Sequence, residues 1–211
     1  MTAFDLSVYL VLDRGLCGDL GMVETARQAA AGGATLIQLR DKGAGLETMV
    51  ETGLKLKQAL EGSGVPLIVN DDVEAAIRIG ADGVHVGQRD LPAAEVRQRI
   101  GPDMILGLSI GSPEEAALID PDIVDYVGVG PVFPTDTKPG HPPAIGFEGL
   151  ASVARACPVP VVAIGGIKRP HVGPALAAGA DGVAIVSAIC GQPDPQEAAR
   201  GFADAIREAR R

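Results

Sequence analysis

The sequence predicts a single α/β domain, a (β/α)8 TIM barrel over residues 1–211. Eight apolar runs of strand length alternate with eight helical segments, which leaves about 26 residues for each strand–helix unit. The runs are apolar throughout, as is typical of parallel strands that helices cover. Similar helix-to-strand junctions also recur at intervals of 47 and 99 residues, close to two and four units: Gly33-Ala34-Thr35, Gly80-Ala81-Asp82-Gly83 and Gly179-Ala180-Asp181-Gly182.

Glycines and one proline delimit the first four units. Strands are expected over 6–12, 35–39, 66–69 and 83–86, and helices over 22–31, 46–60, 73–79 and from about Pro92 onward. The helix stops are Gly32-Gly33, Gly62-Ser63-Gly64 and Gly80. The turn after the first strand, Asp13-Arg14-Gly15, lacks the Gly-rich fingerprint of a doubly wound nucleotide-binding sheet, which makes that fold the weaker alternative.

The last four units have strands over 104–108, 126–129, 159–164 and 182–186, and helices after Ser112, over 148–156, over about 171–178 and from about 195 to the end. Ser112-Pro113-Glu114-Glu115 predicts a capped helix start, with Ser112 as the cap and Glu115 three residues on. Because Ser112 already fills that role, Ser109 is left without an evident structural one.

Composition limits the function. A net charge of −9 argues against a nucleic-acid partner or an anionic membrane. Cys17, Cys157 and Cys190 are far apart with no CxxC, which suggests buried thiols in a reducing compartment. No stretch reaches membrane-spanning length, and the N-terminus lacks a cleavable apolar segment. We therefore expect a cytoplasmic protein that acts on small molecules; a homo-oligomer is compatible with the sequence.

A proline-braced loop follows the sixth strand. Gly130-Pro131 ends the apolar run, and Thr135, Thr137 and Lys138 then place two hydroxyls and an ammonium close together. Such a group of donors suits phosphate oxygens. Since the loops after the strands of a parallel barrel share one face, polar groups from other strands are expected to converge there. These are Gln38, Arg40, Lys42, Asn70, Asp71, Asp90, Ser109, Thr135, Thr137, Lys138, Gly166 and Ser187.

The mixture of charges on this face indicates phosphate and a metal ion. Arg40, Lys42 and Lys138 supply positive charge, whereas Asp71 and Asp90 would oppose phosphate unless a cation lay between. Mg²⁺ held by one or two carboxylates and a substrate phosphate resolves that conflict. The backbone at Gly165-Gly166 and Val186-Ser187 offers a second, metal-free phosphate site, as barrels commonly have after strands seven and eight.

Each residue also has a structural alternative. Asp71 and Asp90 are placed to cap the helices that follow them, and Ser187 is placed to cap the eighth. Arg40 and Lys42 fit equally well as solvated charges. His85, in the middle of the fourth strand, either faces the pocket or belongs to an inward layer of the barrel, and His141 has no assigned role.

An ordered set of motifs resembles the thiamine-phosphate synthase family. They are Gln38-Leu39-Arg40-Asp41-Lys42, Asn70-Asp71-Asp72, Gly87-Gln88-Arg89-Asp90, Gly107-Leu108-Ser109, Pro134-Thr135-Asp136-Thr137-Lys138 and Ile164-Gly165-Gly166-Ile167. The resemblance runs from about Val8 to the last helix and implies that 4-amino-5-hydroxymethyl-2-methylpyrimidine diphosphate reacts with hydroxyethylthiazole phosphate. The products would be thiamine phosphate and diphosphate, by ionisation of the C–O bond before the thiazole nitrogen attacks.

The resemblance also implies roles for individual residues. Gln38, Leu39, Arg40, Asp41, Lys42, Asn70, Ser109 and Lys138 would hold the pyrimidine diphosphate, with Ser109 bonded either to the leaving diphosphate or to the pyrimidine amine. Asp71 and Asp90 would bind Mg²⁺, and Thr135, Asp136, Thr137, Gly166, Val186 and Ser187 would hold the thiazole phosphate. Arg40, Lys42, Ser109 and Lys138 would be catalytic, because they stabilise the leaving group.

Two other functions are compatible with the same fold. A thiazole tautomerase or regulatory paralogue would need neither the acidic pair nor the complete Thr-x-Thr-Lys loop, and this chain has both. A catalytically silent phosphate-binding barrel would bind thiamine phosphate without turning over its precursors.

Overall fold

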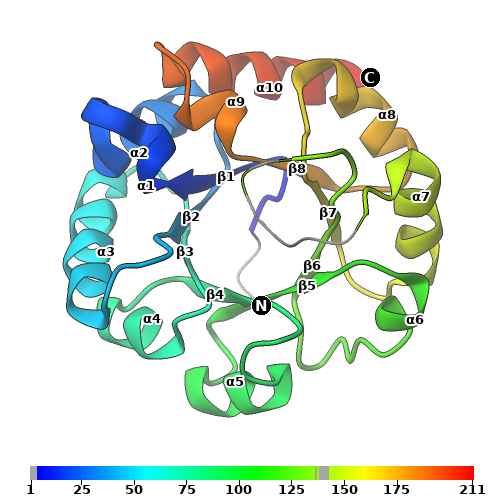
Figure 1. The fold of residues 1–211 in the computed structure, drawn as a ribbon, viewed down its shortest axis with the longest axis horizontal. Coiled ribbons are helices and arrows are strands. Elements are labelled where there is room, and N and C mark those ends of the chain that lie inside the picture. The colour runs from blue at the N-terminus through cyan, green and yellow to red at the C-terminus, as the bar shows by residue number, and fades with distance from the viewer. Residues whose placement is uncertain (1–3, 136, 138–142) are drawn as a thin grey trace.

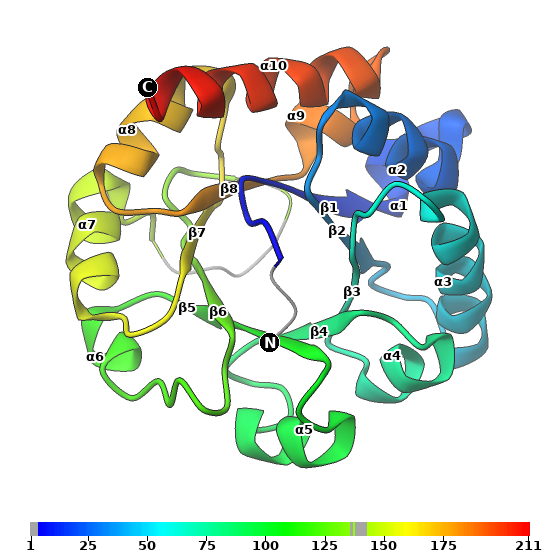
Figure 2. The same ribbon diagram turned by 180° about the vertical axis from the view of Figure 1, so that it is seen from behind.

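The strands close into a parallel barrel. In the computed structural model, which describes residues 4–135, 137 and 143–211, each strand pairs with the next in chain order and the eighth pairs with the first. The strands are β1 (Val8–Asp13), β2 (Leu36–Arg40), β3 (Leu67–Asn70), β4 (Gly83–Val86), β5 (Ile105–Ile110), β6 (Tyr126–Val129), β7 (Val161–Ile164) and β8 (Gly182–Ile185). Figures 1 and 2 show the helices in a ring around them. The predicted (β/α)8 fold is confirmed.

The helices include short ones that the sequence analysis did not predict. The helices are α1 (Arg14–Cys17), α2 (Gly21–Gly32), α3 (Leu46–Leu60), α4 (Val73–Ile79), α5 (Ala93–Ile100), α6 (Pro113–Ala116), α7 (Gly146–Ala156), α8 (Val172–Ala177), α9 (Ser187–Cys190) and α10 (Pro195–Ala209), with 3-10 turns η1 (Gly18–Leu20) and η2 (Arg169–His171). The single-turn helices α1 and α9 follow β1 and β8 directly, where loops were expected. Ser112 caps α6, as predicted, by accepting from the Glu115 N–H.

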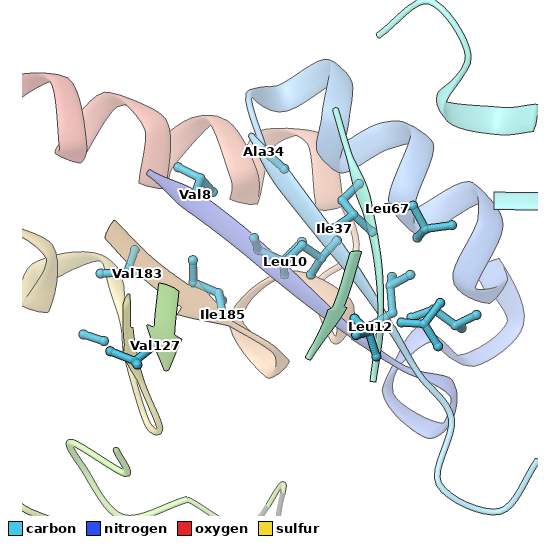
Figure 3. Close-up of a cluster of buried hydrophobic side chains, with 14 of the residues drawn as sticks. Val8, Leu10, Leu12, Ala34, Ile37, Leu67, Val127, Val183 and Ile185 are labelled. Carbon is cyan, nitrogen blue, oxygen red and sulfur yellow. The ribbon is translucent and has the colours of Figure 1, made fainter. Parts of the chain in front are cut away.

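The core has two layers, and the side chains of β1 point alternately into one and the other. Val8, Leu10 and Leu12 point outward and pack with helix residues such as Ala26 and Phe202. Figure 3 shows these three side chains along the strand. Tyr9 and Val11 point inward and pack mainly with residues of other strands, among them Leu36, Ile68, Tyr126 and Val162. The barrel interior is therefore filled by side chains from alternate strand positions, as in other barrels of this size.

The structure bears on two predictions from composition, one about buried thiols and one about membrane-spanning segments. Cys17 and Cys190 are buried as expected, but Cys157 is only partly buried, and all three are free thiols. Among the described residues, no helix combines the length and the apolar character needed to cross a membrane.

Candidate active site

The predicted site residues that the structure describes lie at or near the carboxyl end of the barrel, but several lie within strands and not after them. Gln38, Leu39 and Arg40 belong to β2, Asn70 is the last residue of β3, and Ser109 lies one residue before the end of β5. The alternation of β2 turns the Leu39 side chain into the outer core layer. Any contact between Leu39 and a substrate would therefore have to use its main chain.

The ends of β1 and β2 are joined by two ion pairs. Arg40 Nη1 donates to Asp13 Oδ2 over 3.1 Å, and Arg14 Nε donates to Asp41 Oδ2 over 2.6 Å. Asp13 also caps α1, because its Oδ1 accepts from the Leu16 N–H. The Arg40 side chain is 10% exposed, so the alternative of a solvated charge does not describe it. Arg40 is instead a nearly buried guanidinium at the rim of the barrel.

The acidic pair lies beside Asn70 and Lys42. Burial, followed by the charge of Asp90, raises the pKa of the Asp71 carboxyl, while Lys42 and Asn70 act to lower it. These interactions place all four residues close together. Asp71 has φ of 63°, a left-handed conformation that is uncommon for a residue other than glycine. Strain of this kind, combined with the approach of two carboxylates, is typical of functional sites.

Neither carboxylate is a helix cap. Asp72, not Asp71, caps α4 by accepting from the Ala75 N–H over 2.8 Å, and Pro92 occupies the cap position of α5. Asp90 Oδ2 instead accepts from the Gly87 N–H over 2.7 Å and so closes the β4–α5 turn. The capping alternative is thus wrong for both residues.

The donor set suits a hard divalent cation. Two carboxylates with an amide nearby offer oxygen ligands only, which Mg²⁺ prefers, and Mg²⁺ often completes its shell with water and substrate phosphate. Among the described residues, no cluster of three or more His, Cys, Asp or Glu side chains is placed to hold a metal on its own. The acidic pair therefore fits a magnesium ion that is shared with a phosphorylated substrate.

A cavity of about 140 Å³ lies at the ends of β5 to β8. Its lining includes Ser109, Gly128, Pro131, Thr135, Thr137, Gly165, Gly166, Val186 and Ser187. The Thr137 N–H donates to Thr135 Oγ1, so the two hydroxyls are held in one turn. Thr135, Thr137, Gly166 and Ser187 also line a wider hollow of about 1330 Å³ that extends toward α10. Asp136, Lys138 and His141 lie outside the described residues.

The backbone around this cavity presents main-chain groups. Gly165 and Gly166 have φ of 96° and 63°. Val186, not Ser187, occupies the cap position of α9, and its side chain makes no cap bond. Ser187 is the first residue of α9, and the predicted eighth helix, α10, is capped by Asp194, so the expectation that Ser187 caps the eighth helix is wrong.

Three residues that the sequence analysis did not assign connect the two parts of the site. Tyr9, Tyr126 and His85 form hydrogen bonds inside the barrel and reach Gln38 at one end and Ser109 at the other. His85 therefore belongs to the inward layer, one of its two predicted placements. The chain has only two tyrosines, both in strands, and a buried phenol usually needs a polar partner. Two tyrosines in apolar strands were the available signal for a buried polar contact, but they do not reveal that the two phenols meet.

Comparison with known proteins identifies the family of this chain. The family model described as thiamine monophosphate synthase matches residues 8–189. A thiamine-phosphate synthase of Azorhizobium caulinodans is 47% identical over 208 residues, covering 99% of this chain and 98% of the relative. One from Desulfitobacterium hafniense is 46% identical over 205 residues, covering 97% and 99%.

Solved structures include a protein with a similar sequence and one that shares only the fold. The thiamine phosphate pyrophosphorylase from Pyrococcus furiosus superposes with a TM-score of 0.87 at 37% identity and covers 97% of this chain and 96% of its own. A 3-hexulose-6-phosphate synthase, at 19% identity and a TM-score of 0.66 with 94% and 99% covered, shares the fold alone. The match of the family model over most of the barrel, together with relatives of almost equal length, places this chain in the thiamine monophosphate synthase family.

Proposed function

We propose that this protein is a thiamine-phosphate synthase. It joins 4-amino-5-hydroxymethyl-2-methylpyrimidine diphosphate to hydroxyethylthiazole phosphate: the C–O bond to diphosphate breaks, the thiazole nitrogen forms a new C–N bond, and diphosphate leaves. The observation that carries the proposal is the division of one barrel end into an acidic, cation-flanked part at β2 to β4 and a hydroxyl-lined and glycine-lined cavity at β5 to β8. Two different phosphorylated substrates fit that division.

The first part would hold the pyrimidine diphosphate. The residues that would contact this substrate are Gln38, Arg40, Asp41, Lys42, Asn70, Ser109 and Lys138, with Leu39 contributing its main chain. Asp71 and Asp90 would hold Mg²⁺, which when bound supplies Lewis-acid stabilisation of the leaving diphosphate. Arg40, Lys42, Ser109 and Lys138 are then the catalytic side chains, because negative charge on the diphosphate grows as the C–O bond breaks.

The second part would hold the thiazole phosphate. Thr135 and Thr137, which flank Asp136 in the sequence, would offer hydroxyl donors from the β6 loop. Gly166, Val186 and Ser187 would offer main-chain groups at the ends of β7 and β8. The arrangement aligns the thiazole nitrogen with the carbon that loses diphosphate, so alignment would contribute to the rate together with charge stabilisation. The free thiols also favour a cytoplasmic location.

One assay tests the function. Purified protein is incubated with both precursors, with Mg²⁺ and with a chelator, and thiamine phosphate and diphosphate are quantified. We expect equal amounts of both products, and only when Mg²⁺ is present. Saturable binding of thiamine phosphate without turnover would instead indicate a silent phosphate-binding barrel, and rearrangement of the thiazole phosphate alone would indicate the tautomerase alternative.

Gly166→Ala tests the position of the thiazole phosphate. An added Cβ at Gly166 would lie 2.7 Å from Phe133 Cβ and 2.7 Å from the Pro134 carbonyl oxygen, at a φ that costs an alanine about 1–2 kcal/mol. The β6 loop would have to shift, so KM for the thiazole phosphate should rise about tenfold or more, while KM for the pyrimidine diphosphate changes little.

Gly173→Ala is the matched control, because its added methyl meets Ala209 Cβ at an ordinary 4.0 Å. Steady-state kinetics with each substrate varied in turn give both constants. Equal increases in both KM values for Gly166→Ala would show that the two substrate sites are assigned wrongly.

A further inference from the structure

A continuous chain of hydrogen bonds crosses the interior of the barrel. Gln38 Nε2 donates to the Tyr9 hydroxyl over 2.6 Å, and the Tyr9 and Tyr126 hydroxyls are 2.7 Å apart. The Tyr126 hydroxyl is 2.9 Å from His85 Nδ1, and His85 Nε2 is 2.9 Å from Ser109 Oγ. The chain thus begins and ends at two residues of the proposed pyrimidine diphosphate site, on β2 and β5.

The packing of the barrel interior leaves room for this chain of hydrogen bonds. A Cβ at Gly107 would lie 2.3 Å from Tyr126 Cζ and 2.4 Å from His85 Nδ1, so the absence of a side chain there makes room for both rings. The imidazole of His85 and the ring of Tyr126 have centroids 5.5 Å apart. Tyr9, Tyr126 and His85 are buried. Because the three links from Gln38 to His85 are buried, each proton in that part of the chain of hydrogen bonds has a defined place.

Counting protons determines the direction of the chain. Burial raises the pKa of both Tyr9 and Tyr126 well above neutrality, so each phenol carries one proton. Three contacts lie between Gln38 Nε2 and His85 Nδ1, and each needs one proton. The amide and the two phenols already supply three. A fourth proton on His85 Nδ1 would leave two hydrogens facing each other, so Nδ1 must accept.

The rest of the direction follows from the imidazole. A neutral histidine that accepts at Nδ1 carries its proton on Nε2 and donates from there. Ser109 Oγ is then the acceptor of that bond, and its own hydroxyl proton points elsewhere. Ser109 lines the cavity at the ends of β5 to β8 and is also assigned to the pyrimidine diphosphate, so its proton would lie where the two substrates meet.

We propose that Tyr126 and His85 are positioning residues that hold Ser109 as a hydrogen-bond donor toward the substrate. The atom that Ser109 contacts is accordingly an acceptor, an oxygen of the leaving diphosphate and not the pyrimidine amine. A hydrogen bond donated to that oxygen strengthens as negative charge accumulates on it, so the chain contributes to the rate more than to substrate affinity. The identity of this acceptor rests on the proposed function, whereas the direction of donation along the hydrogen bonds does not.

The reverse direction of the hydrogen bonds predicts the opposite tautomer of His85, which can be measured. If Gln38 turned its amide oxygen toward Tyr9, every proton would shift by one place, and His85 would carry its proton on Nδ1. Ser109 would then donate to His85 and accept from its ligand, as an amine would require. The tautomer of one histidine therefore decides between the two directions.

The tautomer is measured by ¹⁵N NMR on the full chain with labelled histidine near pH 8. The three histidines are separated by comparison with His85→Gln, which removes one set of signals. We expect His85 to be neutral with its proton on Nε2 in the ligand-free protein. A proton on Nδ1 would overturn the proposal, and so would a doubly protonated ring. This result stands whether or not the protein makes thiamine phosphate.

Kinetics test the positioning role. Tyr126→Phe removes the proton that His85 Nδ1 accepts, and kcat should fall about tenfold to a hundredfold with little change in KM, as when the partner of a functional side chain is lost. If Tyr126 acts through Ser109, adding Tyr126→Phe to Ser109→Ala should cost little more than Ser109→Ala alone.

Thr25→Val is the matched control for the loss of a buried hydroxyl. Thr25 is fully buried in α2 and donates to the Gly21 carbonyl over 2.8 Å, away from the site. It should reduce the melting temperature as Tyr126→Phe does, yet leave kcat and the His85 tautomer unchanged. Additive effects of Tyr126→Phe and Ser109→Ala, or an effect on KM alone, would overturn the positioning role. The tautomer measurement on the unaltered chain applies even if Tyr126→Phe does not fold.

Discussion

Asp71→Asn is expected to lower Mg²⁺-dependent turnover by at least about a hundredfold and, at the same time, to raise the melting temperature of the metal-free protein. The first effect follows because a metal ion at a leaving group contributes several kcal/mol, and a neutral amide is a poor substitute for one of two carboxylate ligands. The second follows because the folded chain holds the partly buried Asp71 carboxylate against the charge of Asp90. Removing one charge relieves that repulsion.

The pH dependence of this gain has a definite sign. The pKa of Asp71 is raised in the folded protein, so folding favours its protonated form. Below the unfolded pKa of about 3.9, both states are protonated and Asp71 carries no penalty. As the pH rises from there through the higher folded pKa, Asp71 ionises less readily in the folded protein than in the unfolded one. The free energy of unfolding of the wild-type protein therefore falls. The advantage of Asp71→Asn should therefore be small near pH 4 and should grow as the pH rises, as measured by thermal unfolding in metal-free buffer.

Asp72→Asn is the matched control for this prediction. Asp72 is the adjacent residue and caps α4, and asparagine is an equally good cap. Its replacement should change neither turnover nor stability much. An Asp71→Asn protein that retained wild-type turnover at limiting Mg²⁺ would show that Asp71 is no metal ligand, whatever its effect on stability.

The positions of the strands and of the longer helices could be predicted from the sequence because local signals bound them. The helix Leu46–Leu60 ends where Gly62-Ser63-Gly64 was expected to stop it, and the strand Tyr126–Val129 ends at Gly130-Pro131. A short apolar run followed by glycine or proline has few other conformations available. The single-turn helices α1 and α9 carry no such signal, because four residues are too few for periodicity.

The site was predictable in part, for the same physical reason. Parallel strands bring their carboxyl ends together, so Asp71, Asp90 and Lys42 could be placed near one another without coordinates. Which of Asp71 and Asp72 caps the helix could not be predicted, since both are good caps and only the backbone distinguishes them. The contact between Tyr9 and Tyr126 joins residues 117 apart and depends on the barrel register, which no local pattern reveals.

Arg40→Ala is expected to lower kcat/KM for the pyrimidine diphosphate by about a hundredfold to a thousandfold, the range for removing one preorganised charged donor. The Arg40 guanidinium is nearly buried and is aimed by Asp13, so little conformational freedom is lost when it meets an anion. Asp13 uses the Nη1 donor, and a guanidinium has five N–H donors in all. The remaining donors would bind diphosphate oxygens in a forked geometry.

A merely structural role for Arg40 predicts a different pattern. The Asp13 side chain is 26% exposed and also caps α1, so loss of the ion pair alone should lower the melting temperature by a few degrees and leave the kinetics intact. Arg27→Ala, which removes an exposed guanidinium paired with Glu24 on α2, is the matched control and should leave kcat/KM unchanged. Arg40→Lys keeps the charge without the fork, and only part of the activity should return. Full activity of Arg40→Lys would show that a point charge is sufficient, and full activity of Arg40→Ala would remove Arg40 from the active site and leave it as the partner of Asp13.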